Sequence, residues 1–231
     1  MRLPSRTRFG SWLPLALAAL CCTGWVSPPA QAQQASNLTL NAQLLMAARD
    51  GDMALAERVL AQGAATESRN RLGKTPLHIA AEKGNLALVE RLLAAKADVE
   101  LPSLDKVTPL MAAGYNGHAA VVERLLAAGA RTDPIDRMGK TAAVYAAGQG
   151  HAAVLDALLK AGVDVNAAYE HRLTALMWAA GQGHADAVRL LLARGARPDA
   201  RDDRGLSAAE IARAAGQAAA AQALEAPAPA R

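Results

Sequence analysis

Aromatic side chains are scarce in this sequence. Phenylalanine, tryptophan and tyrosine make up 3% of the 231 residues, although 52% of the residues are hydrophobic. The apolar content comes mainly from alanine, leucine and valine, so we do not expect a thick core built around aromatic rings. Small residues beside paired leucines suit thin layers of closely packed helices, in which each unit buries its apolar face against its neighbours. The composition therefore favours a solenoid.

Cysteine is confined to a single place. The two cysteines, Cys21 and Cys22, lie in an N-terminal segment that we expect to be removed. The mature chain then contains no thiol, which excludes disulfides and thiolate sites from it. Its stability must come from packing alone.

An excess of one charge is also lacking. The net charge of +4 includes Arg2, Arg6 and Arg8 of the same N-terminal segment, and without them 22 lysines and arginines face 21 aspartates and glutamates. A chain so close to neutrality has no net field that attracts phosphate groups. We therefore expect no nucleic-acid partner and no binding to an anionic membrane.

The first 32 residues have the features of a cleavable signal peptide. Arginines precede an apolar stretch at 12–26, and Ala30, Gln31 and Ala32 form a small-residue cleavage site. We expect cleavage after Ala32, export by the general secretory route, and a short linker at 33–36. Retention in the periplasm of a Gram-negative bacterium is the expected outcome, with release as a secreted protein as the alternative.

Three other export signals fit this segment less well. A membrane anchor needs roughly 20 apolar residues, whereas the stretch at 12–26 is shorter and is interrupted by proline and glycine. Lipoprotein processing requires a small residue before the modified cysteine, but Leu20 precedes Cys21. A twin-arginine pair is missing because Thr7 separates the two candidate arginines.

The rest of the sequence repeats itself every 33 residues, which indicates a repeat architecture. Four sets of residues share this period, too many to align by chance. The sets are Thr75, Thr108, Thr141, Thr174 and Ser207; Gly51, Gly84, Gly117, Gly150, Gly183 and Gly216; Val59-Leu60, Leu92-Leu93, Leu125-Leu126, Leu158-Leu159 and Leu191-Leu192; and Gly63, Lys96, Gly129, Gly162 and Gly195.

Each set has a mechanical role in a two-helix unit. The threonine or serine caps the free N–H groups at the start of a first helix, helix A, and Pro76 and Pro109 follow at the first helical position. A glycine about nine residues later ends helix A in the left-handed conformation. The leucine pairs lie in a second helix, helix B, which the other glycine set ends. The residues before the next threonine, such as 130–140, predict an outward turn or hairpin.

The sequence of these units resembles the ankyrin consensus. The match runs from Lys74-Thr75-Pro76-Leu77-His78 through Gly84 and Leu92-Leu93 to Ala97-Asp98-Val99. The resemblance covers residues 37–226 and implies an all-α solenoid of stacked helix-turn-helix units with short β-hairpin or turn connections. The six expected units are 37–69, 70–102, 103–135, 136–168, 169–201 and 202–226, and residues 227–231 form a disordered tail of alanine and proline.

Some units depart from this pattern. The hairpin glycine present as Gly73, Gly139 and Gly205 is replaced by Lys106 and Arg172, so those two hairpins are expected to differ in shape. The first and last units lack several consensus residues, as expected for caps that face water on one side.

The histidines suggest metal binding but have a simpler interpretation. His118, His151 and His184 recur at the period, and units stacked about 8–10 Å apart hold their nitrogens too far apart for one zinc ion, whose ligands lie at about 2.1 Å. We interpret them as hydrogen-bonding residues at helix starts. His78 is expected to brace neighbouring units, because no serine or cysteine nucleophile is predicted beside it.

The predicted binding surface combines the hairpins with the ends of helix A. Tyr145 and Trp178 share the position of Ile79, where packing against the next unit is expected, while Tyr115 and Asn116 end helix A on what the resemblance implies is the concave face. Apolar groups inside a charged rim are typical of interfaces, although packing between hairpins is the alternative. The predicted residues are Arg71, Leu72, Lys74, Leu104, Asp105, Val107, Tyr115, Asn116, Arg137, Met138, Lys140, Tyr169, Glu170, His171 and Leu173.

Taken together, these features predict a monomeric, exported bacterial ankyrin repeat protein that binds another protein. We expect no cofactor, no metal, no catalytic residues and no membrane insertion of the mature chain. Two other functions remain open. One is a secreted effector that binds host proteins, and the other is a metal-dependent or small-molecule enzyme.

Overall fold

The chain folds into a stack of helix pairs. The computed structural model describes the backbone of residues 30–225 and the side chains of residues 37–225. The first helices of the pairs are α1 (Ala30–Asp50), α3 (Pro76–Lys83), α5 (Pro109–Tyr115), α7 (Ala142–Gly148), α9 (Ala175–Gly181) and α11 (Ala208–Ala214). The second helices are α2 (Met53–Ala61), α4 (Leu86–Ala94), α6 (Ala119–Ala127), α8 (Ala152–Lys160), α10 (Ala185–Ala193) and α12 (Ala218–Glu225).

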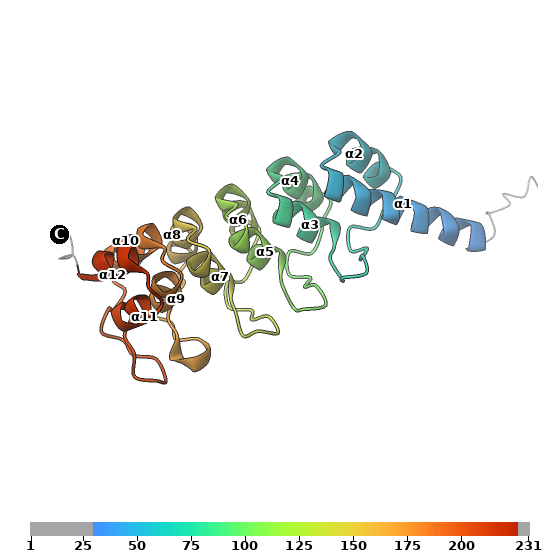
Figure 1. Cartoon of the computed structure of the whole chain (residues 1–231). Coiled ribbons are helices and arrows are strands. Elements are labelled where there is room, and N and C mark those ends of the chain that lie inside the picture. Colours follow the sequence, from blue (N-terminus) through green and yellow to red (C-terminus); the bar gives the residue numbers. More distant parts are fainter. Residues whose placement is uncertain (1–29, 226–231) are drawn as a thin grey trace, which may run out of the picture.

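Each helix packs on its own partner and on the equivalent helices before and after it. Figure 1 shows the two rows side by side, with the connecting loops projecting from the row of first helices toward one side. Residues 30–225 contain no β-strand, and their one isolated antiparallel bridge joins Ala168 to Thr174. The expected all-α solenoid is confirmed.

The helices begin and end where the repeated residues predict. Thr75 accepts a hydrogen bond from the backbone N–H of His78, and the equivalent threonines and serine cap α5, α7, α9 and α11 in the same way. The second helices of the first two pairs are capped by Asp52 and Asn85. Gly84 ends α3 in the left-handed conformation, with a φ of 73°. Local sequence therefore defines the start of α3, α5, α7, α9 and α11, and of the second helices α2 and α4.

The core is one continuous cluster along the stack. Alanine pairs of the first helices, such as Ala80-Ala81 and Ala146-Ala147, are completely buried and allow adjacent helices to approach closely. Only the first member of each leucine pair is completely buried, as in Leu92 and Leu125, whereas Leu93 and the other second members are half-buried. Only one leucine of each pair therefore packs fully between the layers, together with other buried residues of the same helix such as Leu88 and Val89.

The two ends of the chain extend the pattern. Helix α1 is longer than the other first helices and runs past the end of the stack (Figure 1), so residues 33–36, predicted as a linker, are helical. The predicted signal peptide at 1–32 lies outside the described residues except for Ala30, Gln31 and Ala32, which α1 includes. The predicted tail at 227–231 also lies outside them. Over the described part of the chain, no helix combines the length and apolarity needed to cross a membrane.

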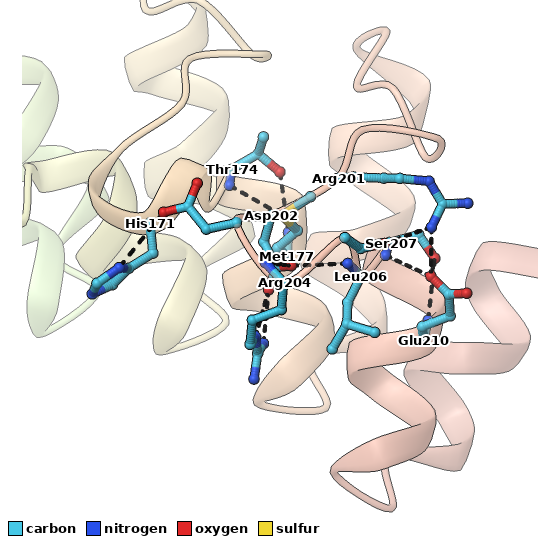
Figure 2. Close-up of polar contacts among 11 residues, drawn as sticks. His171, Thr174, Met177, Arg201, Asp202, Arg204, Leu206, Ser207 and Glu210 are labelled. Atoms are coloured by element: carbon cyan, nitrogen blue, oxygen red, sulfur yellow. Dashed lines mark hydrogen bonds and ion pairs between the residues drawn. The ribbon is translucent and has the colours of Figure 1, made fainter.

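The hairpins share one hydrogen-bonding scheme. In the hairpin at 70–74, the backbone N–H of Asn70 donates to Lys74 and its side chain accepts from Leu72 and Lys74. Asp136 and Asp202 do the same in their hairpins. Figure 2 shows the last of these, in which Asp202 contacts Arg204 and Leu206.

The start of α11 lies beside this hairpin. In Figure 2, Glu210 lies between Ser207 and Arg201, accepting hydrogen bonds from the backbone N–H of Ser207 at 2.7 Å and from the Arg201 guanidinium at 3.2 Å. Ser207 Oγ in turn accepts from the N–H of Glu210. This reciprocal cap stabilises the first turn of the last pair, where packing is available on one side only.

The two hairpins without glycine differ from each other in backbone shape. Lys106 takes up the left-handed conformation itself, with a φ of 62°, and donates its N–H to Ser103 as Gly73 does to Asn70. The expected change of shape is therefore wrong for this hairpin. In the hairpin at 169–173, both His171 and Arg172 have positive φ and a short 3₁₀ turn (Glu170–Arg172) forms. Tyr169, which replaces the aspartate, has no carboxylate to accept the turn's N–H groups, so the shape does change here.

Candidate functional site

The hairpin tips carry exposed apolar side chains. Leu72, Leu104 and Met138 lie on three successive hairpin tips and are 59%, 58% and 56% exposed. Leu72 and Met138 occupy equivalent positions, and Leu104 precedes the equivalent position of its hairpin by one residue. Adjacent tips are joined through the backbone, because the N–H of Leu104 donates to Leu72 and that of Arg137 donates to Asp105. These three side chains form a short apolar row on the outer edge of the stack.

The other predicted apolar residues pack inward. Val107 and Leu173 contact the core and are half-buried, because they are the last hairpin residues and lie at the foot of the next helix. Tyr169 is half-buried too, and burial raises the pKa of its hydroxyl. The packing alternative therefore holds for these three residues, whereas the tips are free. Exposed Ile135, before the third hairpin, was not among the predicted residues.

Charged residues surround the tips. Arg71, Asp105, Arg137, Glu170 and His171 are exposed. The Arg137 guanidinium lies 3.9 Å from the Asp105 carboxylate, which links the second and third of the five hairpins. His171 lies 3.7 Å from Asp203 and 3.8 Å from Glu170. The predicted polar rim is present.

An aromatic groove runs below the hairpins, along the ends of the first helices. Tyr115 at the end of α5 is 46% exposed, and its ring meets that of Tyr145 edge-on, with centroids 5.4 Å apart. This tyrosine pair separates two cavities. One of about 380 Å³ extends toward Trp178 and Gln182, and one of about 450 Å³ extends toward His78 and Met111.

A hydrogen bond fixes the Tyr145 ring. Its hydroxyl donates to the carboxylate of Asp136, a buried residue that also accepts from the backbone N–H groups of Met138 and Lys140. Burial, together with this bond to a carboxylate, raises the pKa of Tyr145. The hairpin and α7 are therefore tied together at the centre of the groove.

Two lysines line the groove at the feet of their hairpins. Lys74 pairs with Glu82 at 2.7 Å. Lys140 instead lies over the rings of Tyr145 and Trp178, at 5.4 Å and 5.0 Å from their centroids. Such cation–π contacts hold an ammonium group in place without neutralising its charge.

His78 forms part of the wall of the larger cavity. It is only 1% exposed, and its Nδ1 has no hydrogen-bond partner. Burial, and the charge of Lys74 beside it, lower its pKa to about 4. The imidazole is therefore neutral at pH 7, consistent with the expected structural role. Within residues 37–225, no group of three or more histidines, cysteines, aspartates or glutamates is arranged to hold a metal ion.

The repeated histidines join neighbouring units. His118, His151 and His184 occupy the capping positions of α6, α8 and α10, but none of their side chains caps its own helix. Each Nε2–H instead donates to a backbone carbonyl at the end of the first helix of the preceding unit. The acceptors are Glu82, Tyr115 and Gly148, at 3.1, 2.9 and 3.0 Å. The histidines are therefore hydrogen-bonding residues at helix starts, as expected, but each bond joins two units instead of capping a helix. The ring reaches back because the preceding unit's glycine leaves room for it: a Cβ at Gly117 would lie 2.6 Å from Nδ1 of His151.

The structure brings many of the predicted binding residues together. Lys74, Asp105, Val107, Tyr115, Asn116, Met138 and Lys140 line the larger cavity. Met138, Lys140, Tyr169, Glu170, His171 and Leu173 line a smaller one of about 160 Å³. Leu72 borders a separate cavity near α1 with Lys74. Arg71, Leu104 and Arg137 line none of these cavities and remain surface residues.

Several groove residues were missed by the sequence analysis. Tyr145 and Trp178 pack against the core as expected, yet each also borders the smaller of the two groove cavities. The size of the two rings could have indicated that they reach the groove. They are larger than the equivalent Ile79 and Ala112, which are buried. Glu82, Gln149 and Gln182, expected beside Tyr115 on the same surface but not among the predicted binding residues, also line the groove cavities.

Comparison with known proteins gives a consistent result. A family model described as ankyrin repeats in three copies matches residues 44–136, 83–169 and 110–202. Among solved structures, the crystal structure of EF0377, an ankyrin repeat protein, is similar, with a TM-score of 0.72 and 26% sequence identity over 80% of this chain and 97% of that chain. No curated protein matches the sequence.

Proposed function

The chain belongs to the ankyrin repeat family, and from this premise we propose that it binds one specific protein through its hairpin tips and aromatic groove. Ankyrin repeats are protein–protein interaction modules. The family is typically non-enzymatic, and the proposal assigns this chain no reaction of its own.

One observation carries the proposal. Leu72, Leu104 and Met138 are exposed in a row, and Tyr115 is exposed at the groove beneath them. Aromatic and methionine side chains inside a charged rim are features of protein interfaces. The exposed surface of these groups is not covered by the stack, so a partner explains why it is apolar.

The stack also suits this task mechanically. The tips are linked by backbone hydrogen bonds, and Tyr145 ties one hairpin to its helix. Contact residues held in place before a partner arrives lose less conformational entropy on binding. We propose that the binding surface acts as a rigid template and that the protein acts as a monomer.

The experiment is capture of a partner from envelope extract with three proteins. They are the wild type, the double variant Tyr115→Ala with Met138→Ala, and Leu38→Ala as a control that removes an exposed apolar side chain from α1. We expect the wild type and the control to capture the same protein and the double variant to lose it, with helicity unchanged. Equal capture by all three would place the binding surface elsewhere.

We further propose that the protein is exported by the general secretory route and kept in the periplasm. The positive start, apolar stretch and small-residue site of residues 1–32 support this. Fractionation of expressing cells, with N-terminal sequencing, is the test. A periplasmic chain that begins at Gln33 is expected, whereas recovery from the medium or an uncleaved chain in the membrane contradicts the proposal.

A further inference from the structure

Equivalent positions in two units treat their lysine differently. In the unit at 70–102, Lys74 at the end of the hairpin is neutralised at 2.7 Å by Glu82, eight residues later in α3. In the unit at 136–168, the equivalent residues are Lys140 and Gly148. The carboxylate is therefore missing where the second lysine would need it. No carboxylate lies within ion-pair distance of the Lys140 ammonium among the side chains of residues 37–225.

The acidic groups around the groove have other neighbours. Glu170, which lines the cavity of about 160 Å³ together with Lys140, lies 3.8 Å from His171. Asp136 accepts hydrogen bonds from the Tyr145 hydroxyl and from two backbone N–H groups, and Asp105 lies beside Arg137. The ammonium of Lys140 lies over two aromatic rings in a half-buried position. A partly desolvated cation without an anion is costly, and the rings compensate only part of this cost.

The lysine borders a groove of suitable form for a peptide. It lines both cavities, of about 380 and 450 Å³, that lie on either side of the Tyr115–Tyr145 pair. The larger cavity also has the apolar side chains of Val107, Met111 and Met138 in its wall. The smaller one has the side-chain amides of Gln149 and Gln182, which can bond to a peptide backbone.

We propose that this groove binds an extended acidic segment of the partner, with an aspartate or glutamate side chain paired to Lys140. A neighbouring apolar side chain of the segment then fills the larger cavity. The inference rests on the proposed function and specifies the chemistry of the partner. Charge complementarity supports this inference, because the ligand would supply the carboxylate that is missing at Gly148.

The same geometry favours a carboxylate over a phosphate. A phosphorylated side chain carries nearly two negative charges and is usually bound by clusters of arginines. The two groove cavities have no arginine in their walls, and Lys74 is already paired. A single unpaired lysine matches a single carboxylate.

The chain offers a matched pair of variants for the test. Gly148 has helical backbone in α7, and a Cβ placed there would meet only Trp178, at 3.9 Å, which is an ordinary contact. Gly148→Glu would place a carboxylate where it can pair with Lys140, as Glu82 pairs with Lys74. Lys140 would then no longer be available to an acidic ligand. Gly148→Gln adds nearly the same volume without the charge. Neither variant disturbs the backbone conformation.

The probe is a displayed library of random twelve-residue peptides, selected against protein purified from cells that express the full chain. We expect selected peptides to carry an aspartate or glutamate next to an apolar residue. Lys140→Met and Gly148→Glu should each weaken them by about 10-fold or more, the effect of losing a hydrogen bond to a charged group. Gly148→Gln should weaken them by less than about 3-fold. A Lys140→Glu variant should prefer peptides whose acidic residue is replaced by lysine.

Other outcomes separate this inference from the function it rests on. Peptides that lose binding with Tyr115→Ala but not with Lys140→Met would overturn the acidic ligand and leave protein binding intact. Loss of binding on amidation of the peptide C-terminus, with no effect of the acidic side chain, would assign the carboxylate to a chain end and also overturn the inference. A library without any binder that depends on Tyr115 would contradict both proposals.

Discussion

The second helices and the groove are built by the same units, but they differ in how far their residues repeat from one unit to the next. In the second helices, Val59, Leu92, Leu125, Leu158 and Leu191 are all completely buried at the same place in successive units. At the end of the first helices, the equivalent residues are Glu82, Tyr115, Gly148 and Gly181, so an acid, an aromatic residue and glycine share one position. Positions that hold the stack together repeat their residue, and positions that face the groove do not. The groove is therefore where the chain is free to specify a ligand.

The largest effect should come from the repeating side of this comparison. Leu125→Ala removes a completely buried side chain between two layers and should lower the free energy of unfolding by about 2–5 kcal/mol. Tyr115→Ala removes a side chain that is nearly half exposed and should cost less than about 1 kcal/mol. Urea unfolding followed by circular dichroism measures both. Equal costs would show that the groove, too, is built for stability.

His78 sharpens the comparison, because it lines the groove and yet is buried like a core residue. Its pKa of about 4 lies below the usual 6.5, so the unfolded chain takes up the proton first as the pH falls. Stability is therefore complete above pH 6.5 and is lost between pH 6.5 and 4, by about 3 kcal/mol at the lower end. The measurement is the free energy of unfolding of the wild type and of His78→Leu from pH 7 to pH 4. As the pH falls, the free energy of unfolding should decrease more for the wild type than for His78→Leu. An equal decrease in both proteins would contradict the low pKa of His78.

The two glycine sets give the smallest contrast. Gly129 has a φ of 89° with open space around it, so Gly129→Ala should cost about 1 kcal/mol, the price of a left-handed alanine. Gly117 has a φ of 79° and the His151 ring against it, so Gly117→Ala should cost about 2 kcal/mol or more. Thermal unfolding of both variants measures the difference. In a chain that also carries His151→Ala, Gly117→Ala and Gly129→Ala should cost the same. If Gly117→Ala still cost more, its effect would not come from the His151 ring.

The sequence was sufficient for the elements because their causes are local. Thr75 caps a helix three residues away, and Gly84 ends that helix within the same unit. The period then repeats this local information, which makes the stack predictable. Lys106 shows the limit of the argument, because the hydrogen bonds of the hairpin impose the left-handed conformation on a residue that does not favour it.

The site was less predictable because its causes are not local. The partners of His118 and His151 lie 36 residues earlier, and no spacing within a unit indicates them. Whether Tyr145 and Trp178 face the core or the groove depends on how much of each ring the neighbouring unit covers. Of the predicted apolar residues, Leu72, Leu104 and Met138 are exposed at the tips, whereas Val107 and Leu173 pack against the core, which depends on side-chain direction at the foot of the helix.

The histidine joints determine how such a chain can change in length. The units at 103–135, 136–168 and 169–201 each carry both halves of the joint, an imidazole that reaches backward and a glycine that receives the side chain of the next unit, so each of these units can follow another. The ends are marked differently: Asn85 takes the histidine's place against Gly51, and Gln217 takes it against Gly183. A duplicated or deleted copy of 33 residues therefore fits within the array but not beyond its first or last joint. Growth by duplication is thus directed to the interior, where it lengthens the groove and leaves the ends unchanged.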